Sequence, residues 1–379
     1  MKKKMISIFI VVGLIVLLVG ILVNDNTKDS KLKDISEVKA RVVETDNSEM
    51  IQSGISKIGN QMLQVKVLEG EYKGEVIQAS NHLMGKLQMD NYYEVGDKIV
   101  ISIVKKDGKI FDAKAIDLYR QQWQFLLFAI FVLALIIFAG YVGLKALFSF
   151  IASLFVIWTI LIPGLLEGQN PLVLASICLV LLSGIILFSI AGFTRKGLAA
   201  FLGTMSGLLA TVVITIFFGN MMRLGGMTAP FAETLLFSGH LDLNMKYIFY
   251  AAVIIGASGA AMDIAIDIAA SMEEVKVKKP DISAKELIQS GFNVGRSVIG
   301  TMTTTLLLAY SGGYLTLLML FMTKKTSFAR IINFKMVAAE ILRTVTGSIG
   351  LVLVAPITAL IAGWIYTVDF NELIKNRNK

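Results

Sequence analysis

Eight apolar stretches of about 20 residues or more constrain this chain more than any other feature of its sequence. An α-helix crosses the roughly 30 Å hydrocarbon core of a bilayer in about 20 residues, and no backbone polar group can stay unpaired there. The composition agrees, because 55% of the residues are hydrophobic and only 17% are charged. We therefore predict a polytopic α-helical membrane protein with about eight transmembrane helices, over residues 5–23, 125–144, 146–166, 171–193, 197–222, 247–272, 297–323 and 344–368.

These stretches divide the chain into three parts. Residues 1–23 form an N-terminal transmembrane anchor, and we favour an uncleaved anchor over a signal peptide because no small-residue cleavage site follows it. Residues 24–120 form a polar insert after this first helix. Residues 121–379 form a seven-helix transmembrane domain.

Basic residues next to the spans predict how the chain crosses the membrane. Three lysines at positions 2–4 precede the first span, so the positive-inside rule puts the N-terminus in the cytoplasm and residues 24–120 outside it. The loop 323–343 contradicts this locally, because it falls outside and carries Lys324, Lys325, Arg330 and Lys335. Either the seventh span is re-entrant and the C-terminus lies outside, or the first spans decide the orientation; we favour the second.

The insert between the first two spans reads as a small β domain. A polar tether, residues 24–36, is followed by short Val- and Ile-rich runs that turn signals separate. Such a series predicts a small extracytoplasmic β-barrel-like domain, with an OB-like arrangement as the leading candidate. The expected strands cover residues 38–45, 62–68, 74–79, 98–104 and 110–118.

The charge of this insert excludes one class of partner. From Asn24 to Arg120 there are fifteen basic and sixteen acidic residues, so the positive surface that binds nucleic acid is absent. We interpret the domain first as a scaffold or docking module at the membrane surface. The alternative is that it recognises a ligand or an envelope protein.

Two carboxylates lie inside the sixth span, where hydropathy alone would predict none. Asp263 and Asp267 are one helical turn apart, ~6 Å by helix geometry, and two such groups do not both ionise in a low-dielectric site without a counter-ion. One of them would hold a proton or coordinate a cation, as a proton- or cation-linked carrier requires. The structural alternative is that they pair with a neighbouring helix.

Other polar side chains near the last two spans are candidate partners of these carboxylates. Arg296 and Asn293 precede the seventh span, at about the level of Asp267. Glu340 and Arg343 are three residues apart before the eighth span, and they either neutralise each other or supply charge to the site.

Hydroxyl groups gather in the first turns of the seventh span. They either line a hydrophilic path or bond back to their own helix, and the sequence does not decide between the two. The residues are Thr301, Thr303, Thr304 and Thr305.

Three local signals predict where helices begin or bend. Ser283 and Glu286 have the spacing of a capping box, which starts a helix leading into the seventh span. The glycine pair in segment 310–314 weakens that span near its middle, and Pro356 predicts a kink in the eighth.

Several kinds of chemistry are disfavoured. The two histidines, His82 and His240, are far apart in the sequence, and Cys178 is the single cysteine. We expect no metal site, no cofactor and no enzymatic activity. An intramembrane aspartyl protease is a poor fit, because its two aspartates would face each other from different helices.

The segments around these polar residues resemble the YibE/F family of bacterial multi-spanning membrane proteins. The resemblance covers most of the chain, with anchor, small β domain and helical part in the family's order, and it implies a bacterial plasma membrane location. It implies no chemistry, so no role is carried over to any residue. The matching segments are GASGAAMD at 256–263, SMEE at 271–274, SGFNVGR at 290–296, GTMTTT at 300–305, LAYSGG at 308–313, EILR at 340–343, GSIG at 347–350 and Pro356.

These observations favour a transporter or permease that carries an unknown small solute or ion across the lipid bilayer. Asp263 would be the main proton or cation site, Asp267 its coupled partner, and Arg296 or Arg343 the counter-charge. The alternative is an envelope assembly factor that binds an envelope protein through residues 24–120.

Overall fold

The structure, a computed structural model, describes residues 35–106 and 109–368. It divides into two compact units that meet in the sequence at Phe138 and Ala139, and each is described by itself. The predicted first span and all of the predicted tether except Ile35 and Ser36, which belong to the first strand, lie outside the described residues.

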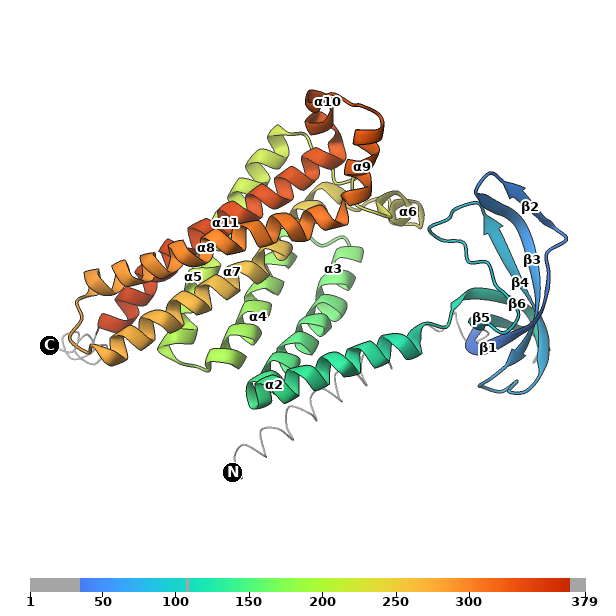
Figure 1. Ribbon diagram of the computed structural model, residues 1–379, viewed down its shortest axis with the longest axis horizontal. Helices are drawn as coiled ribbons and strands as arrows, with labels where there is room; N and C mark the ends of the chain where they lie inside the picture. The colour runs from blue at the N-terminus through green and yellow to red at the C-terminus, as the bar shows by residue number, and fades with distance from the viewer. Residues whose placement is uncertain (1–34, 107–108, 369–379) are drawn as a thin grey trace. The chain divides into compact units, whose positions relative to one another are not determined.

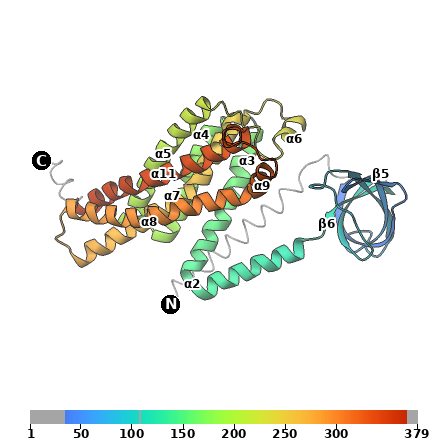
Figure 2. The same ribbon diagram turned by 45° about the horizontal axis from the view of Figure 1, so that its top comes forward.

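The first unit contains a closed β-barrel (Figure 1). Its strands pair in the order β1-β5-β6-β4-β3, and β1 also pairs with β3, which closes the ring seen end-on in Figure 2. β4 and β6 are parallel, and the other pairs are antiparallel. The predicted small barrel is confirmed, and its five-stranded ring has the OB-like form. The strands are β1 (Ile35–Asp46), β2 (Met50–Ser53), β3 (Ser56–Val67), β4 (Val76–Met84), β5 (Lys98–Lys106) and β6 (Lys109–Leu118).

A β-hairpin was missed by the sequence analysis. β2 pairs with the first residues of β3, and Gly54 turns the chain between them with a φ of 61°. β3 therefore begins at Ser56, six residues before the expected strand. This part of β3 is polar and carries little apolar alternation, so its pairing with β2 and β4 is what holds it extended.

Two buried amide side chains inside the barrel, those of Gln61 and Asn81, are held by hydrogen bonds. Gln61 is fully buried; its amide nitrogen donates to the backbone oxygen of Tyr93 at 2.8 Å, and its amide oxygen accepts from the Tyr93 N–H at 3.2 Å. Asn81 donates to Gln61 and to the backbone oxygen of Asn91. Burial raises the pKa of Tyr93 to about 12, because its phenol is shielded from water.

The rest of the described chain is helical. Several helix starts are capped by side chains: Asn170, Thr194 and Asn244 each accept backbone N–H bonds at the starts of their helices. The elements are α2 (Gln121–Val156), the π-helix η2 (Ile157–Leu161), α3 (Ile162–Leu166), α4 (Pro171–Ala191), α5 (Arg195–Met221), α6 (Ala232–Phe237), α7 (Met245–Lys278), α8 (Ala284–Gly313), α9 (Leu315–Thr323), α10 (Phe328–Asn333) and α11 (Lys335–Thr367).

Within the described residues, five helical stretches are long and apolar enough to cross a membrane, or six if α8 and α9 count as one broken span. The second and third predicted spans form one helical stretch over residues 121–166. It is interrupted at Gly140, with φ 54° and ψ −124°, and not at the expected boundary near Lys145. Only glycine adopts such backbone angles without strain. The helix continues through Lys145, whose ammonium lies 5.3 Å from the centre of the Tyr141 ring.

Close contacts between α5 and α11 form the centre of the helical part. The two helices run antiparallel, and glycines on each meet larger side chains on the other. A Cβ atom at Gly203 would lie 2.1 Å from Oγ1 of Thr358, and one at Gly207 would lie 2.1 Å from Cγ2 of Val354. Small residues thus let the two backbones approach closely, as is common in membranes.

α7 and α8 also pack through glycines. The Cβ position of Gly291 lies 2.5 Å from Sδ of Met272, and that of Gly295 lies 3.4 Å from Cδ1 of Ile268. In both Figure 1 and Figure 2, α7, α8 and α11 run alongside one another. α8 is therefore anchored to α7 and α11 over its first turns.

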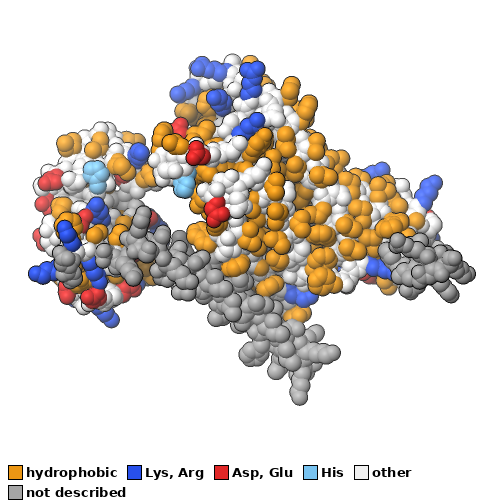
Figure 3. All heavy atoms as spheres, turned by 180° about the vertical axis from the view of Figure 1, so that it is seen from behind, with side chains coloured by type: hydrophobic (Ala, Val, Ile, Leu, Met, Phe, Trp, Pro, Cys, Tyr) orange, Lys and Arg blue, Asp and Glu red, His pale blue; other side chains and the backbone are white. Residues whose placement is uncertain are grey.

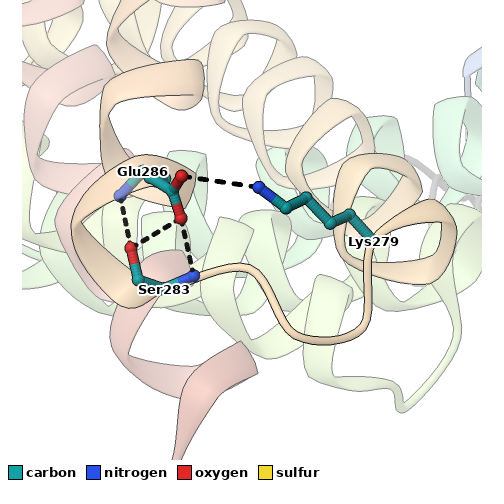
Figure 4. Close-up of polar contacts among 3 residues, drawn as sticks. All are labelled: Lys279, Ser283 and Glu286. Carbon is teal, nitrogen blue, oxygen red and sulfur yellow. Dashed lines mark hydrogen bonds and ion pairs between the residues drawn. The ribbon is translucent and has the colours of Figure 1, made fainter.

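The predicted capping box at the start of α8 is confirmed (Figure 4). Ser283 Oγ accepts from the Glu286 N–H at 3.3 Å, and the Ser283 N–H donates to Oε2 of Glu286 at 3.1 Å. Lys279 Nζ lies 3.4 Å from Oε1 of the same carboxylate. The lead-in helix and the first part of the seventh predicted span are one continuous helix, since α8 has no break before Gly313.

The predicted weak point after Tyr310 is a sharp bend. α8 ends at Gly313, α9 begins at Leu315, and the two helices differ in direction by 67° at Tyr314. α11, in contrast, continues through Pro356 as a single helix.

Candidate functional site

One face of α7 carries only small and acidic side chains. Between residues 245 and 276, every large apolar residue of this helix is buried or half-buried. Because the exposed positions are mostly three, four or seven residues apart, they form one stripe along the helix, which we call the acidic face. It consists of Ala252, Gly256, Gly259, Asp263 and Asp267, with Glu274 beyond its end.

The neighbouring long helices expose the opposite kind of side chain. α5 exposes Leu209 and Phe217, and α11 exposes Leu360 and Trp364. Figure 3 shows such hydrophobic side chains over the middle of the helical part, with Lys and Arg gathered near its ends. This is the surface expected of helices that contact lipid, and the acidic face of α7 departs from it.

The acidic face is turned toward α8. A Cβ atom at Gly256 would lie 3.2 Å from the hydroxyl of Tyr310. Asp263 and Asp267 follow Gly256 by seven and eleven residues, which is about two and three helical turns, so they point to the same side. The two carboxylates therefore lie along the seam between α7 and α8.

The part of α8 opposite them is polar. Counting from the contacts of Gly295 with Ile268 and of Tyr310 with Gly256, the antiparallel helices bring Asp263 level with Thr301 and Asp267 level with Ser297. The exposed residues of α8 between 289 and 305 include no large apolar side chain. They are Gln289, Asn293, Arg296, Ser297, Gly300, Thr301, Thr304 and Thr305.

Three threonines of α8 bond back to their own helix, which is one of the two predicted alternatives. Thr301, Thr303 and Thr305 each donate to a backbone oxygen three or four residues earlier, at 2.9–3.1 Å. Their hydroxyl oxygens still carry free lone pairs, because the bonds use only the proton. Thr304 is exposed.

Arg296 lies at the expected level but does not pair with Asp267 among the described residues. Its guanidinium donates to Oδ1 of Asn293 at 3.4 Å, which brings these two predicted residues together. Arg296 lines a cavity of about 310 Å³ with Val352 and Pro356 of α11. Its side chain therefore points along α11 and not across to α7.

Glu340 and Arg343 form the predicted ion pair, with Nη1 and Oε1 3.2 Å apart. The guanidinium also lies 5.8 Å from the centre of the Phe249 ring of α7. The second carboxylate oxygen, Oε2 of Glu340, is buried and has no hydrogen-bond partner among the described residues. The hydroxyl of Tyr310 interacts electrostatically with both charged groups, and that of Tyr314 lies within hydrogen-bonding range of both.

The predicted site residues thus fall into two groups. One is Asp263 and Asp267 with the polar residues of α8 at their level, and the other is the ion pair of Glu340 and Arg343 on α11. Phe249, which marks the level of Arg343 on α7, precedes Asp263 by fourteen residues, or ~21 Å of helix. Arg343 is therefore too far from Asp263 to act as its direct counter-charge.

Two tyrosines were missed from the sequence, Tyr310 near the end of α8 and Tyr314 in the bend that follows it. Tyr310 and Tyr314 join the groups, since Tyr310 reaches the acidic face at Gly256 and both rings interact with Glu340. The signal available was their position four residues apart, on either side of the predicted weak point of the seventh span.

The described residues contain no group of three or more His, Cys, Asp or Glu side chains that could hold a metal ion. The acidic face offers two carboxylates with nearby hydroxyl oxygens. Such a set can exchange protons or give transient oxygen ligands to a monovalent cation.

The fold and the site together define a multi-spanning membrane protein with a small β-barrel ahead of its helical part. The chain belongs to the YibE/F family: the model of the YibE/F-like protein matches residues 127–368, and that of the YibE/F family N-terminal domain matches residues 31–118. The resemblance seen in the sequence is thereby confirmed. Neither a curated protein nor a solved structure matches this chain.

Proposed function

We propose that this protein is a transporter or permease for a small solute or ion, with a proton- or cation-linked site at Asp263 and Asp267. The observation that supports this most is the composition of the acidic face of α7. It carries two carboxylates and no large apolar side chain, inside a helix that is apolar enough to span the membrane.

The energetic argument is that such a face is poorly suited to lipid. An aspartate at the centre of a spanning helix costs about 2.5–3.5 kcal/mol, and two on one face roughly double the cost. Glycine and alanine add little apolar area to offset it. A face of this kind is stable against water, ions or polar groups, which is the environment of a transport path.

The two carboxylates have distinct roles in this proposal. Asp263 lies nearer the middle of the helix and binds the coupling proton or cation, while Asp267 is one turn further on and is coupled to it by charge. Hydroxyls of α8 at the same level, Thr301 and Ser297, contribute oxygen ligands. The proposal includes no catalytic step, no cofactor and no nucleic-acid partner.

The arrangement in the membrane is part of the same proposal. We propose eight spans in a bacterial plasma membrane, with the N-terminus in the cytoplasm and residues 24–120 outside. The 67° bend between α8 and α9 is compatible with a broken span and with a re-entrant segment, and these two place the loop 323–343 on opposite sides of the membrane. Reaction of cysteines placed at Asn26 and at Lys379 with an impermeant reagent in intact cells tests the sidedness of each end.

The transport proposal is tested by flux measurements on the purified full chain in sealed vesicles. Proton flux is followed with an internal pH-sensitive dye, and sodium flux with radiolabelled sodium. We expect Asp263→Asn to abolish a flux that the natural chain supports. Glu274→Gln is the matched control, because Glu274 is also an α7 carboxylate but is exposed and paired with Lys278. Equal fluxes for the natural chain and Asp263→Asn would contradict the proposal.

A second candidate function is supported by the barrel surface. The β2–β3 hairpin exposes Ile51 and Ile55, and the segment that follows β4 exposes Leu87. Exposed apolar groups of this kind often mark protein-binding surfaces, and they support the alternative that the barrel is a docking module for an envelope protein. In that case deletion of the barrel would cause the loss of function, although Asp263 is intact, and Asp263→Asn would not. The isolated barrel would also capture its partner.

A further inference from the structure

A cavity of about 240 Å³ lies in the bend between α8 and α9, against α11. Its walls are mainly aliphatic, with Leu307, Leu317 and Leu318 on the α8–α9 side and Ile341 and Val345 on α11. Leu307 and Leu318 are themselves exposed, so the cavity opens onto the apolar surface of the helical part. A ligand that enters here must have apolar character.

Besides the hydroxyls of Ser311 and Thr344, one carboxylate and two tyrosine rings give this cavity its chemistry. The carboxylate of Glu340 is its only charged lining residue among those described, and Tyr310 and Tyr314 present aromatic rings beside it. Arg343 pairs with Oε1 of Glu340 but does not line the cavity, since its guanidinium lies toward the Phe249 ring. A molecule inside therefore meets the carboxylate and not the guanidinium.

Oε2 of Glu340 is an unfilled hydrogen-bond acceptor. It is buried and accepts no bond among the described residues, although a buried carboxylate oxygen normally has a partner. An N–H donor with a positive charge satisfies it best, because charge-assisted bonds are about twice as strong as neutral ones. The tyrosine rings favour the same kind of ligand through cation–π attraction.

From these contacts we propose that the cavity is a binding site for a small aromatic or alkyl ammonium ion. Its ammonium group donates to Oε2 of Glu340 and its apolar part fills the space between α8, α9 and α11. Size is adequate, because a cavity of about 150 Å³ already holds benzene. As a substrate site this inference rests on the proposed transport function; as a binding site it stands alone.

The position of Tyr310 connects this cavity to the acidic face. Tyr310 lines the cavity and also places its hydroxyl 3.2 Å from the Cβ position of Gly256, at the start of that face. A bound cation would therefore sit on one side of this tyrosine, with Asp263 further along α7 on the other.

The test is equilibrium binding of radiolabelled tryptamine to the purified full chain, with two competitors of the same shape. Tryptophol is neutral and indole-3-acetate is an anion, so they separate charge recognition from apolar filling. We expect saturable tryptamine binding that both competitors displace at least about tenfold less well than unlabelled tryptamine does. Equal displacement by tryptophol would overturn the inference and show an apolar cavity without charge selectivity, as for a lipid chain.

Variants locate the site. Glu340→Gln keeps the shape of the side chain and removes its charge, and we expect tryptamine binding to weaken at least about tenfold. Leu318→Trp narrows the cavity from α9 without touching the ion pair, so it gives the same loss if Glu340→Gln fails to fold. Glu274→Gln serves as the control and should bind normally. Unchanged affinity in both Glu340→Gln and Leu318→Trp would overturn the assignment.

Asp263→Asn separates this inference from the transport proposal. We expect it to bind tryptamine normally, because Asp263 lies outside the cavity. If Asp263→Asn lost tryptamine binding and Glu340→Gln kept it, the inference would be overturned and the cation site would lie on α7. If tryptamine bound normally but neither the natural chain nor any variant supported a proton or sodium flux, the transport proposal alone would be contradicted.

Discussion

α5 and α7 are both long helices of the same unit, they pack against each other, and they place their side chains in opposite ways. α5 turns glycines such as Gly203 and Gly207 inward against α11 and exposes large apolar residues such as Leu209. Up to Lys276, α7 buries or half-buries its large apolar residues, including Tyr250, and exposes glycine, alanine and acidic residues. Mean hydropathy therefore identifies both helices as spans, whereas the composition of the exposed face indicates which of them contacts lipid.

The barrel provides a reference for how polar groups are treated elsewhere in the chain. Gln61, Asn81 and Tyr93 are buried there and hydrogen-bonded, and they hold the loop that precedes β5. Asp263 and Asp267 are exposed and have no hydrogen bond or ion pair with another described residue. Buried polar groups with fixed partners serve structure, and unpartnered ones in a spanning helix are available for function.

Exchanging the two kinds of face should have the largest effect. Leu209→Asp puts a carboxylate on the exposed side of α5 near its centre, and we expect it to destabilise the membrane-inserted protein by about 3 kcal/mol. Asp263→Leu should be tolerated in folding, because it removes a charge from a spanning helix. Yield and thermal unfolding of the purified variants measure both effects. A well-folded Leu209→Asp chain would show that the two faces do not differ in environment.

The tyrosine inside the barrel should make the domain's stability depend on pH. The pKa of Tyr93 is raised in the folded state to about 12, so the stabilisation is fully present below pH 10 and is lost as the pH rises from 10 through 12. The shift corresponds to roughly 2–3 kcal/mol.

Residues 35–118 close their own sheet around their own core, so this segment can be studied alone. Urea unfolding at pH values from 8 to about 12 should show the decline for the natural segment and a flatter curve for Tyr93→Phe. Parallel declines for the two would remove Tyr93 as the cause.

Matched glycine substitutions should give a smaller effect whose sign differs between the two helices. At Gly207 an added Cβ would lie 2.1 Å from Val354, and we expect Gly207→Ala to destabilise the protein by about 2 kcal/mol. At Gly259 no heavy atom lies within 4 Å of the added Cβ, and alanine there should stabilise the helix by about 0.5–1 kcal/mol. Melting temperatures in detergent report both. A comparable loss at Gly259 would mean that another chain segment covers the acidic face.

Much of the fold could be predicted from the sequence, because the strongest signals are local. The lengths of the apolar stretches located the long helices. The spacing of Ser283 and Glu286 located a helix start, and the Gly312–Gly313 pair located the bend. The break at Gly140 was placed at Lys145 instead, since charge was taken as the stronger signal.

The candidate site could be predicted only in part, because side-chain direction depends on how helices pack. The pairing of Glu340 with Arg343 follows from their spacing on one helix. The contact of Arg296 with Asn293 instead of Asp267 depends on which side of α8 faces α11. The cavity beside Tyr314 arises from the 67° bend and has no signature in any single segment.

The central claim is that the acidic face of α7 lies along a water-accessible path, and cysteine accessibility tests it most directly. Gly259→Cys and Leu209→Cys place thiols on the exposed sides of α7 and α5, and the natural chain with its buried Cys178 gives the background. We predict that a membrane-impermeant, water-soluble maleimide labels Gly259→Cys in intact membranes and leaves Leu209→Cys at background. Background labelling at Gly259→Cys, or equal labelling at both positions, would contradict the account.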